Sequence, residues 1–271
     1  MVVRVTDDRQ HPAAQPPREQ DPPTEALPAA ATPTPVLVAS GLGVQGNAGW
    51  IFRDVDLRLP AGSLTAVVGP AGCGRSSLLL ALAGRMRPTA GSLSVLGHNL
   101  ADDPSAVRNL TSIARAASTV RPEPALTVRE SVDERCLIDD VGPVEGSNRF
   151  QRACTVLQFA PDPSAPVESV TGEQAALLAI ALAYVRTGAV ILVDDVDRDV
   201  RSTTRHGLMR ALRRLAATGP AIVVTATDRA AVPDADLTVE LPLPAGRTEW
   251  SFNPDSAPAA PKPEASQGDA R

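Results

Sequence analysis

One glycine-rich segment carries residues whose types and spacing suit phosphate binding. Residues 69–77 read GPAGCGRSS, which matches the pattern GxxxxGK[ST] except that arginine stands where lysine is expected. Glycines allow successive backbone N–H groups to turn inward around phosphate oxygens, at a helix start that favours an anion. Ser76 is also a candidate Mg²⁺ ligand. The candidate nucleotide-binding residues are Gly69, Pro70, Ala71, Gly72, Cys73, Gly74, Arg75, Ser76 and Ser77.

The arginine in this segment changes the chemistry that we expect. Arg75 keeps the positive charge of lysine but adds a bulky planar fork, so attraction of an anion is better preserved than the fit to a γ-phosphate. Two other interpretations stay open: a glycine-rich turn without ligand, and a dinucleotide-binding loop of the GxxGxG type. A dinucleotide-binding loop needs an acidic residue after the next strand, but the candidate strand 92–96 is followed by Gly97, His98 and Asn99.

The flanking sequence predicts the elements that position this loop. Residues 63–68 (SLTAVV) have the composition of a buried strand, and residues 76–86 have that of a helix without a breaker before Gly84. Short β-rich runs alternate with longer helical ones along the chain, and a second apolar strand, 190–193 (VILV), ends in two aspartates. This alternation predicts an α/β fold with a mostly parallel sheet.

Composition excludes several classes of protein. With 271 residues and 43% hydrophobic content, the chain can bury one substantial core. Its net charge of −5 disfavours a nucleic-acid partner. Cys73, Cys136 and Cys154 have the spacing of neither a disulfide framework nor a zinc site, so we expect reduced thiols. The longest apolar run, 175–185, is shorter than the roughly 20 residues of a membrane helix, and the amino terminus does not resemble a secretion signal.

Changes in composition predict where the folded part begins and ends. Residues 1–35 contain eight prolines and no aromatic residue, and residues 247–271 are similarly rich in proline and alanine. Such segments bury too little apolar area to offset the loss of chain entropy, so we expect two disordered tails around a domain at 36–246.

Residues on both sides of the loop resemble ATP-binding cassette (ABC) ATPases. The stretch 54–62 resembles the opening strand and turn of that family, and 87–97 resembles its proline-to-glycine turn with the following strand. The resemblance extends over about 36–243. It implies a P-loop NTPase-like ABC nucleotide-binding domain with a helical subdomain at about 121–185, and ATP and Mg²⁺ as cofactors.

The second half carries further matches in the order of the family. Residues 190–195 resemble the Walker B segment, in which Asp194 would hold Mg²⁺ through water. Asp195 would be the catalytic residue that polarises the attacking water, with a side chain one methylene shorter than the usual glutamate. A purely structural role for these acids stays open. The family signature LSGGQ falls on Val170, Thr171, Gly172, Glu173 and Gln174, where the glutamate places an unfavourable charge near phosphate. The same residues also fit a helix start with a capping box.

Two other positions depart from the family pattern. The glutamine of the Q-loop falls on Ser118, and no histidine follows the late strand 221–224, because the chain has only His11, His98 and His206. Trp50 lies near the region of the adenine-stacking aromatic, with a place in the core as the alternative.

The resemblance implies the ATP-binding subunit of an ABC-type membrane transport complex. We expect it to bind Mg·ATP, to form a nucleotide-sandwiched homodimer, and to hydrolyse ATP slowly or not at all, since several catalytic parts are altered together. Its partner would be a multi-span membrane permease, docked through residues 121–169, which places the chain in the cytoplasm at the inner face of the membrane. A regulatory or scaffolding pseudo-ATPase and an ordinary active ABC ATPase remain as alternatives.

Overall fold

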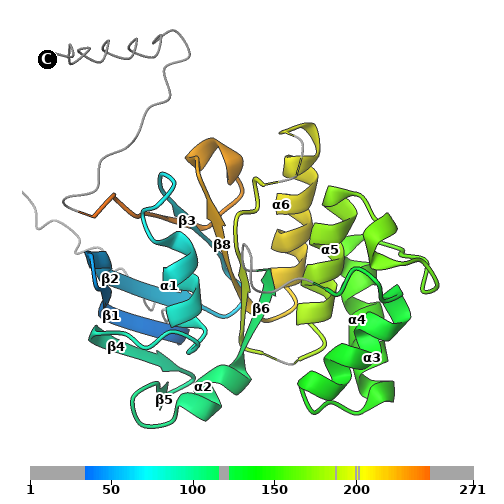
Figure 1. Ribbon diagram of the computed structural model, residues 1–271, viewed down its shortest axis with the longest axis horizontal. Helices are drawn as coiled ribbons and strands as arrows, with labels where there is room; N and C mark the ends of the chain where they lie inside the picture. Colours follow the sequence, from blue (N-terminus) through cyan, green and yellow to red (C-terminus); the bar gives the residue numbers. More distant parts are fainter. Residues whose placement is uncertain (1–33, 116–121, 187, 199, 201, 245–271) are drawn as a thin grey trace, which may run out of the picture. The chain divides into compact units, whose positions relative to one another are not determined.

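The computed structural model describes residues 34–244 except 116–121, 187, 199 and 201, and it contains two β-sheets (Figure 1). A five-stranded sheet has the order β6-β7-β8-β3-β9, and every neighbouring pair in it is parallel. Its strands are β3 (Leu64–Val68), β6 (Thr111–Arg115), β7 (Val190–Val193), β8 (Ala221–Ala226) and β9 (Leu237–Glu240). The parallel sheet and the strand at 190–193 confirm the sequence prediction.

The second sheet is antiparallel and was not predicted. It has the order β2-β1-β4-β5, formed by β1 (Pro35–Gly46), β2 (Gly49–Pro60), β4 (Ala90–Val95) and β5 (His98–Asn99). β1 and β2 are a long hairpin with several register shifts. Buried and exposed side chains alternate from Val55 to Leu59 in β2, whereas most side chains of β1 are buried or half-buried. Such half-buried strands could not be assigned to a separate sheet from the sequence, because the alternation does not say which strands pair.

Two hydrophobic cores lie on opposite faces of the parallel sheet. One core joins α1 (Arg75–Leu82) and the antiparallel sheet to one face of β3, β7 and β8. The other joins the opposite face to α3 (Val128–Ile138), α4 (Pro143–Leu157), α5 (Gly172–Ala183) and α6 (Ser202–Ala216). Figure 1 shows these four helices on the side of β6 away from α1, while the short α2 (Pro104–Leu110) leads into β6.

Local signals fix where the helices begin and end. α3 starts with a capping box between Thr127 and Glu130, and the hydrogen bonds from Thr127 lower the pKa of the Glu130 carboxyl. α1 ends at Leu82, so the predicted helix to residue 86 was too long; Gly84, in the left-handed region with φ +66°, stops it early. No helix of the described residues is long and apolar enough to cross a bilayer. The predicted tails lie almost wholly outside the described residues, and the domain boundaries stay predictions.

Gly146 allows α4 to pack closely on α3. A Cβ atom at Gly146 would lie 2.1 Å from Sγ of the buried Cys136, and 3.3 Å from a methyl group of Val185. By contrast, a Cβ at Gly207 on the exposed side of α6 would meet no atom of the described residues within 4 Å. The two helical glycines therefore differ only in what surrounds them.

We expect Gly146→Ala to lower the free energy of unfolding by about 1–3 kcal/mol, because the added methyl group overpacks the α3–α4 contact. Gly207→Ala is the matched control and should raise it by up to about 1 kcal/mol through helix propensity. Urea denaturation of the two variants measures both changes, and equal stability of Gly146→Ala and the wild type would contradict the packing argument.

Candidate functional site

The carboxyl ends of three neighbouring strands bring the candidate residues together. β8 lies between β7 and β3 in the parallel sheet, with Val193 paired to Val224 and Val68 paired to Ala226. The loop 69–74 follows β3, and Asp194 and Asp195 follow β7. Residues separated by about 120 positions in sequence therefore meet at one edge, which is where ligands bind in open α/β sheets.

Gly74 shapes the turn from the loop into α1. It has φ +97°, and a Cβ atom there would lie 2.7 Å from the carbonyl oxygen of Ile51. Gly74 is the N-cap of α1 and has no side chain to cap the helix. The first turn of α1, which begins at Arg75, therefore presents backbone N–H groups without an intrahelical acceptor, an arrangement that suits an anion.

The Arg75 side chain is folded into the loop and is only 9% exposed. Its guanidinium donates to the carbonyl oxygens of Gly69 and Pro70, the latter at 3.0 Å, and its Nη2 lies 3.0 Å from Asp195 Oδ1. Its Nε is buried and has no hydrogen-bond partner among the described residues. A buried cation with an unused donor fits a further acceptor such as a phosphate oxygen.

Ser76 and Asp194 supply two oxygens of the kind that Mg²⁺ prefers. Ser76 Oγ donates to Asp194 Oδ2 at 2.6 Å, and Asp194 is fully buried. No group of three or more His, Cys, Asp or Glu side chains in the described part of the chain could hold a metal by itself. An Mg²⁺ ion here would thus also need water and phosphate oxygens, which is usual for this ion.

Asp195 is held in an uncommon backbone conformation. Its φ is +46°, in the left-handed region that non-glycine residues seldom adopt, and its side chain is 17% exposed. Its backbone N–H donates to Thr225 Oγ1 at 2.8 Å. The same hydroxyl donates to Asp194 Oδ1 at 2.6 Å. The sequence interpretation did not include Thr225 in the site, because the local sequence does not show that β8 pairs with β7 and so brings Thr225 next to both acids.

The side chain of Cys73 lies inside the loop, and its predicted part in nucleotide binding stays a prediction. The side chain is fully buried, and burial raises the pKa of its thiol although the nearby Arg75 charge opposes that shift. The neutral thiol packs where a Cβ atom on Gly69 would come within 2.8 Å of it. Cys73 therefore fills the loop as a small apolar group.

The residues of the proposed signature lie at the start of α5, where Thr171 is the N-cap and Gly172 is the first helical residue. Thr171 accepts from the backbone N–H of Gln174, and the Gln174 side chain accepts from the backbone N–H of Thr171, which confirms the predicted capping box. In Figure 1, α5 and α1 lie on opposite sides of β6. The signature segment and the loop that starts α1 are therefore on different parts of the domain.

The model of the family described as ABC transporter matches residues 52–197, which is just over half of the chain. The chain belongs to the ABC transporter family. Its fold, a P-loop ABC nucleotide-binding domain, agrees with the solved structures below, and the predicted family and fold class are confirmed.

Similar proteins include ATP-binding subunits of importers. The chain is 47% identical over 73 residues to the hemin import ATP-binding protein HmuV of Gloeobacter violaceus, covering 27% of this chain and 26% of that protein. It is 23% identical over 188 residues to the Fe(3+) ions import ATP-binding protein FbpC 1 of Haemophilus influenzae, covering 68% and 56%. The chain thus spans about a quarter to just over half of the length of these relatives.

Solved structures share the fold at low sequence identity. A dimeric structure of a bacterial ABC transporter cassette has a TM-score of 0.64 and 19% identity, with 76% of this chain and 94% of that chain covered. A structure titled as the ATP-binding subunit of an ABC transporter has a TM-score of 0.63 and 20% identity, covering 76% and 85%.

The remaining predicted positions of this ABC domain have different outcomes. Ser118 and His11 lie outside the described residues. His98 lies in β5 and His206 on the exposed side of α6, so neither extends from the end of β8. Trp50 is half-buried in the β1–β2 hairpin, with its ring next to Gly43, and its adenine role stays a prediction.

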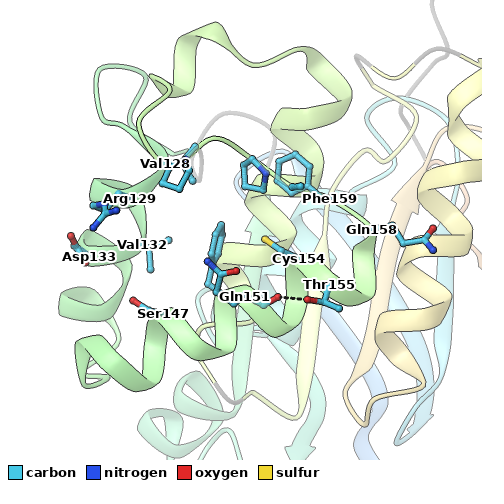
Figure 2. Close-up of a pocket in the computed structure, with 14 residues that line it drawn as sticks. Val128, Arg129, Val132, Asp133, Ser147, Gln151, Cys154, Thr155, Gln158 and Phe159 are labelled. Carbon is cyan, nitrogen blue, oxygen red and sulfur yellow. Dashed lines mark hydrogen bonds between the residues drawn. The ribbon is translucent and has the colours of Figure 1, made fainter.

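The helical part of this ABC domain contains a groove between α3 and α4 (Figure 2). Its cavity has a volume of about 590 Å³. The floor is apolar and includes Val132, Phe150 and Cys154, whose thiol pKa burial raises to about 11. Exposed Arg129 and Gln151 lie at its rim.

The partly buried ion pair of Arg75 and Asp195 predicts a stability effect. We expect Asp195→Asn to lower the free energy of unfolding by about 1–3 kcal/mol, because Arg75 would keep its buried charge without its counter-ion. Asparagine tolerates the left-handed backbone, so the change isolates the charge.

Asp54 offers a matched control in the same protein. It has φ +56° and pairs with Arg53 at 3.6 Å, but the two side chains are 83% and 60% exposed. Asp54→Asn should change the free energy of unfolding by less than about 0.5 kcal/mol. Equal effects of the two substitutions in urea denaturation would refute the argument from burial.

Proposed function

We propose that this chain is the ATP-binding subunit of an ABC-type membrane transport complex and binds Mg·ATP at the loop 69–77. The observation that carries the proposal is the buried Arg75 Nε, which has no partner in the described part of the chain and lies next to the uncapped start of α1 and the Ser76–Asp194 pair. These groups offer a cation and backbone donors for phosphate, and two oxygens for Mg²⁺. ATP and Mg²⁺ are thus the proposed ligands, with Asp194 holding the ion through water.

We propose further that hydrolysis is slow or absent. Asp195 is the candidate catalytic residue, whose carboxylate would polarise the attacking water. Its Oδ1 accepts a hydrogen bond from Arg75 Nη2 at 3.0 Å. An oxygen that already accepts a hydrogen bond from a guanidinium has less capacity left to accept one from an attacking water, so this contact opposes the catalytic role. Glu173 of the signature adds a negative charge where the family presents its loop to phosphate. An ordinary active ABC ATPase is the alternative that turnover distinguishes.

The separation of the loop from the signature supports a homodimer. α1 and α5 lie on opposite sides of β6 in one copy (Figure 1), so a site that uses both segments needs a second copy. One of the similar solved structures is titled as a dimeric ABC transporter cassette. We therefore propose that two copies sandwich two nucleotides, each between the loop of one copy and the signature of the other.

The groove between α3 and α4 is the proposed docking surface for the membrane partner. It lies within the predicted segment 121–169, and it combines an apolar floor with a polar rim, which suits a peptide segment of a permease (Figure 2). Docking there would place the chain at the inner face of the membrane. Relatives are named for import and for macrolide export, so the proposal leaves direction and substrate open.

A non-transporting pseudo-ATPase is the second candidate. It is favoured by the Arg75 guanidinium, which already has acceptors in two loop carbonyls and Asp195 without any nucleotide. If the chain is a pseudo-ATPase, the Arg75 guanidinium would stabilise the loop permanently instead of binding phosphate.

Calorimetric titration of Mg·ATP into the purified protein tests the proposal. We expect saturable binding that Arg75→Ala weakens about tenfold or more, because the variant loses the buried cation. Arg152→Ala removes an exposed arginine of α4 and is the matched control, with affinity unchanged.

The outcomes of this titration separate the candidates. Absence of binding by the wild type would favour the pseudo-ATPase. Binding together with steady-state phosphate release at a rate ordinary for an active cassette, about 1–100 per second, would refute the proposal of slow hydrolysis alone.

Arg129→Glu and Gln151→Ala change the rim of the groove and leave its buried floor intact. We expect both to reduce the fraction of the full chain that sediments with membranes of its host, because contacts with the permease are lost. Arg210→Ala on the exposed side of α6 is the control. Unchanged sedimentation of both rim variants would contradict docking at the groove.

A further inference from the structure

Thr225 connects the two acidic residues at the end of β7. It is fully buried near the end of β8, and its hydroxyl contacts Asp194 Oδ1 at 2.6 Å and the backbone nitrogen of Asp195 at 2.8 Å. Its carbonyl oxygen accepts from the backbone N–H of Val196 at 2.9 Å. One residue of β8 thus makes hydrogen bonds to three successive residues of the neighbouring loop.

The direction of these hydrogen bonds is fixed by chemistry. A carboxylate can only accept, so the Thr225 hydroxyl donates its one proton to Asp194. A backbone N–H can only donate, so the lone pairs of the same oxygen accept from Asp195. Both capacities of the hydroxyl are used, and its rotation is therefore restricted.

The two carboxylate oxygens of Asp194 therefore have different hydrogen-bond partners. Oδ1 is held by Thr225, and Oδ2 points to Ser76 Oγ at 2.6 Å. The oxygen that faces the proposed Mg²⁺ position is thereby oriented by a group that does not contact the ion. Partners of this kind orient metal ligands, and their loss commonly weakens metal binding by about 10- to 100-fold.

The consequence for Asp195 concerns its backbone. The hydrogen bond to Thr225 helps to hold it at φ +46°, a conformation that needs support from the surrounding structure. In that conformation its carboxylate meets Arg75 Nη2. Thr225 therefore acts on the acid that would hold Mg²⁺ and on the acid that would face the reacting water.

We propose that Thr225 is the positioning residue of this site, which sets the Mg²⁺ dependence of nucleotide binding through Asp194 and Asp195. The proposal rests on the proposed binding of Mg·ATP. A role confined to packing would require only the shape of the side chain, whereas the positioning role requires its hydroxyl.

The test compares Thr225→Val, which keeps the shape and removes the hydroxyl, with Thr225→Ser, which keeps the hydroxyl. Thr225→Ala repeats the removal without placing a methyl group against the Asp194 carboxylate. Thr65→Val is the matched control, because Thr65 is also a buried threonine of the parallel sheet and its hydroxyl has no partner among the described residues. ATP is titrated calorimetrically into each full-length variant, with excess Mg²⁺ and with EDTA, after thermal unfolding has shown that the variant is folded.

We expect Mg²⁺ to strengthen ATP binding by the wild type, Thr225→Ser and Thr65→Val to a similar extent. Thr225→Val and Thr225→Ala should lose about tenfold or more of this gain, while their affinity in EDTA stays within about threefold of the wild type.

If the wild type binds no ATP under either condition, the proposed function fails and the positioning role fails with it. If the wild type shows the Mg²⁺-dependent gain and both variants without the hydroxyl retain it, the positioning role alone is overturned. Failure of Thr225→Ser to restore the gain would also overturn it, because the hydroxyl would then be insufficient.

Discussion

The buried carboxylate of Asp194 is the constraint around which the site is organised. A charged group without exposure to solvent is costly unless hydrogen-bond donors compensate it, and Ser76 and Thr225 each place a hydroxyl 2.6 Å from one of its oxygens. These donors come from α1 and β8, so the carboxylate joins both elements to the end of β7. The strand order β7-β8-β3 makes this possible, because it places β8 between the acids and the loop.

The same edge of the parallel sheet carries a second contact between charged groups, the ion pair of Arg75 and Asp195. Arg75 and Asp195 compensate each other in a partly buried pair, and the guanidinium also holds two carbonyl oxygens of the loop. Lysine, with a compact ammonium group, could not reach three acceptors in this planar arrangement. The replacement of lysine by arginine and of glutamate by aspartate is therefore consistent with an adapted pair, in which a longer base meets a shorter acid.

The arrangement of the two cores separates the parts of the domain that would bind nucleotide and partner. One core attaches α1 and the antiparallel sheet to the parallel sheet, and the other attaches the helices that carry the proposed signature and the groove. Since β3, β7 and β8 contribute side chains to both cores, movement at the loop would be transmitted through strands that are buried on both faces. This geometry suits a domain that couples a nucleotide to a membrane protein.

The sequence by itself determined the family, the parallel sheet and the local elements that carry motifs. The loop 69–77, the strand 190–193 and the capping box at Thr171 depend on residues close in sequence, so pattern and propensity were sufficient. The antiparallel sheet and the place of Thr225 were decided only by the tertiary structure. The pairing of β1 with β4 and the contact between β7 and β8 join residues that are about 30 or more positions apart, and their partners are selected by packing, which no local pattern records.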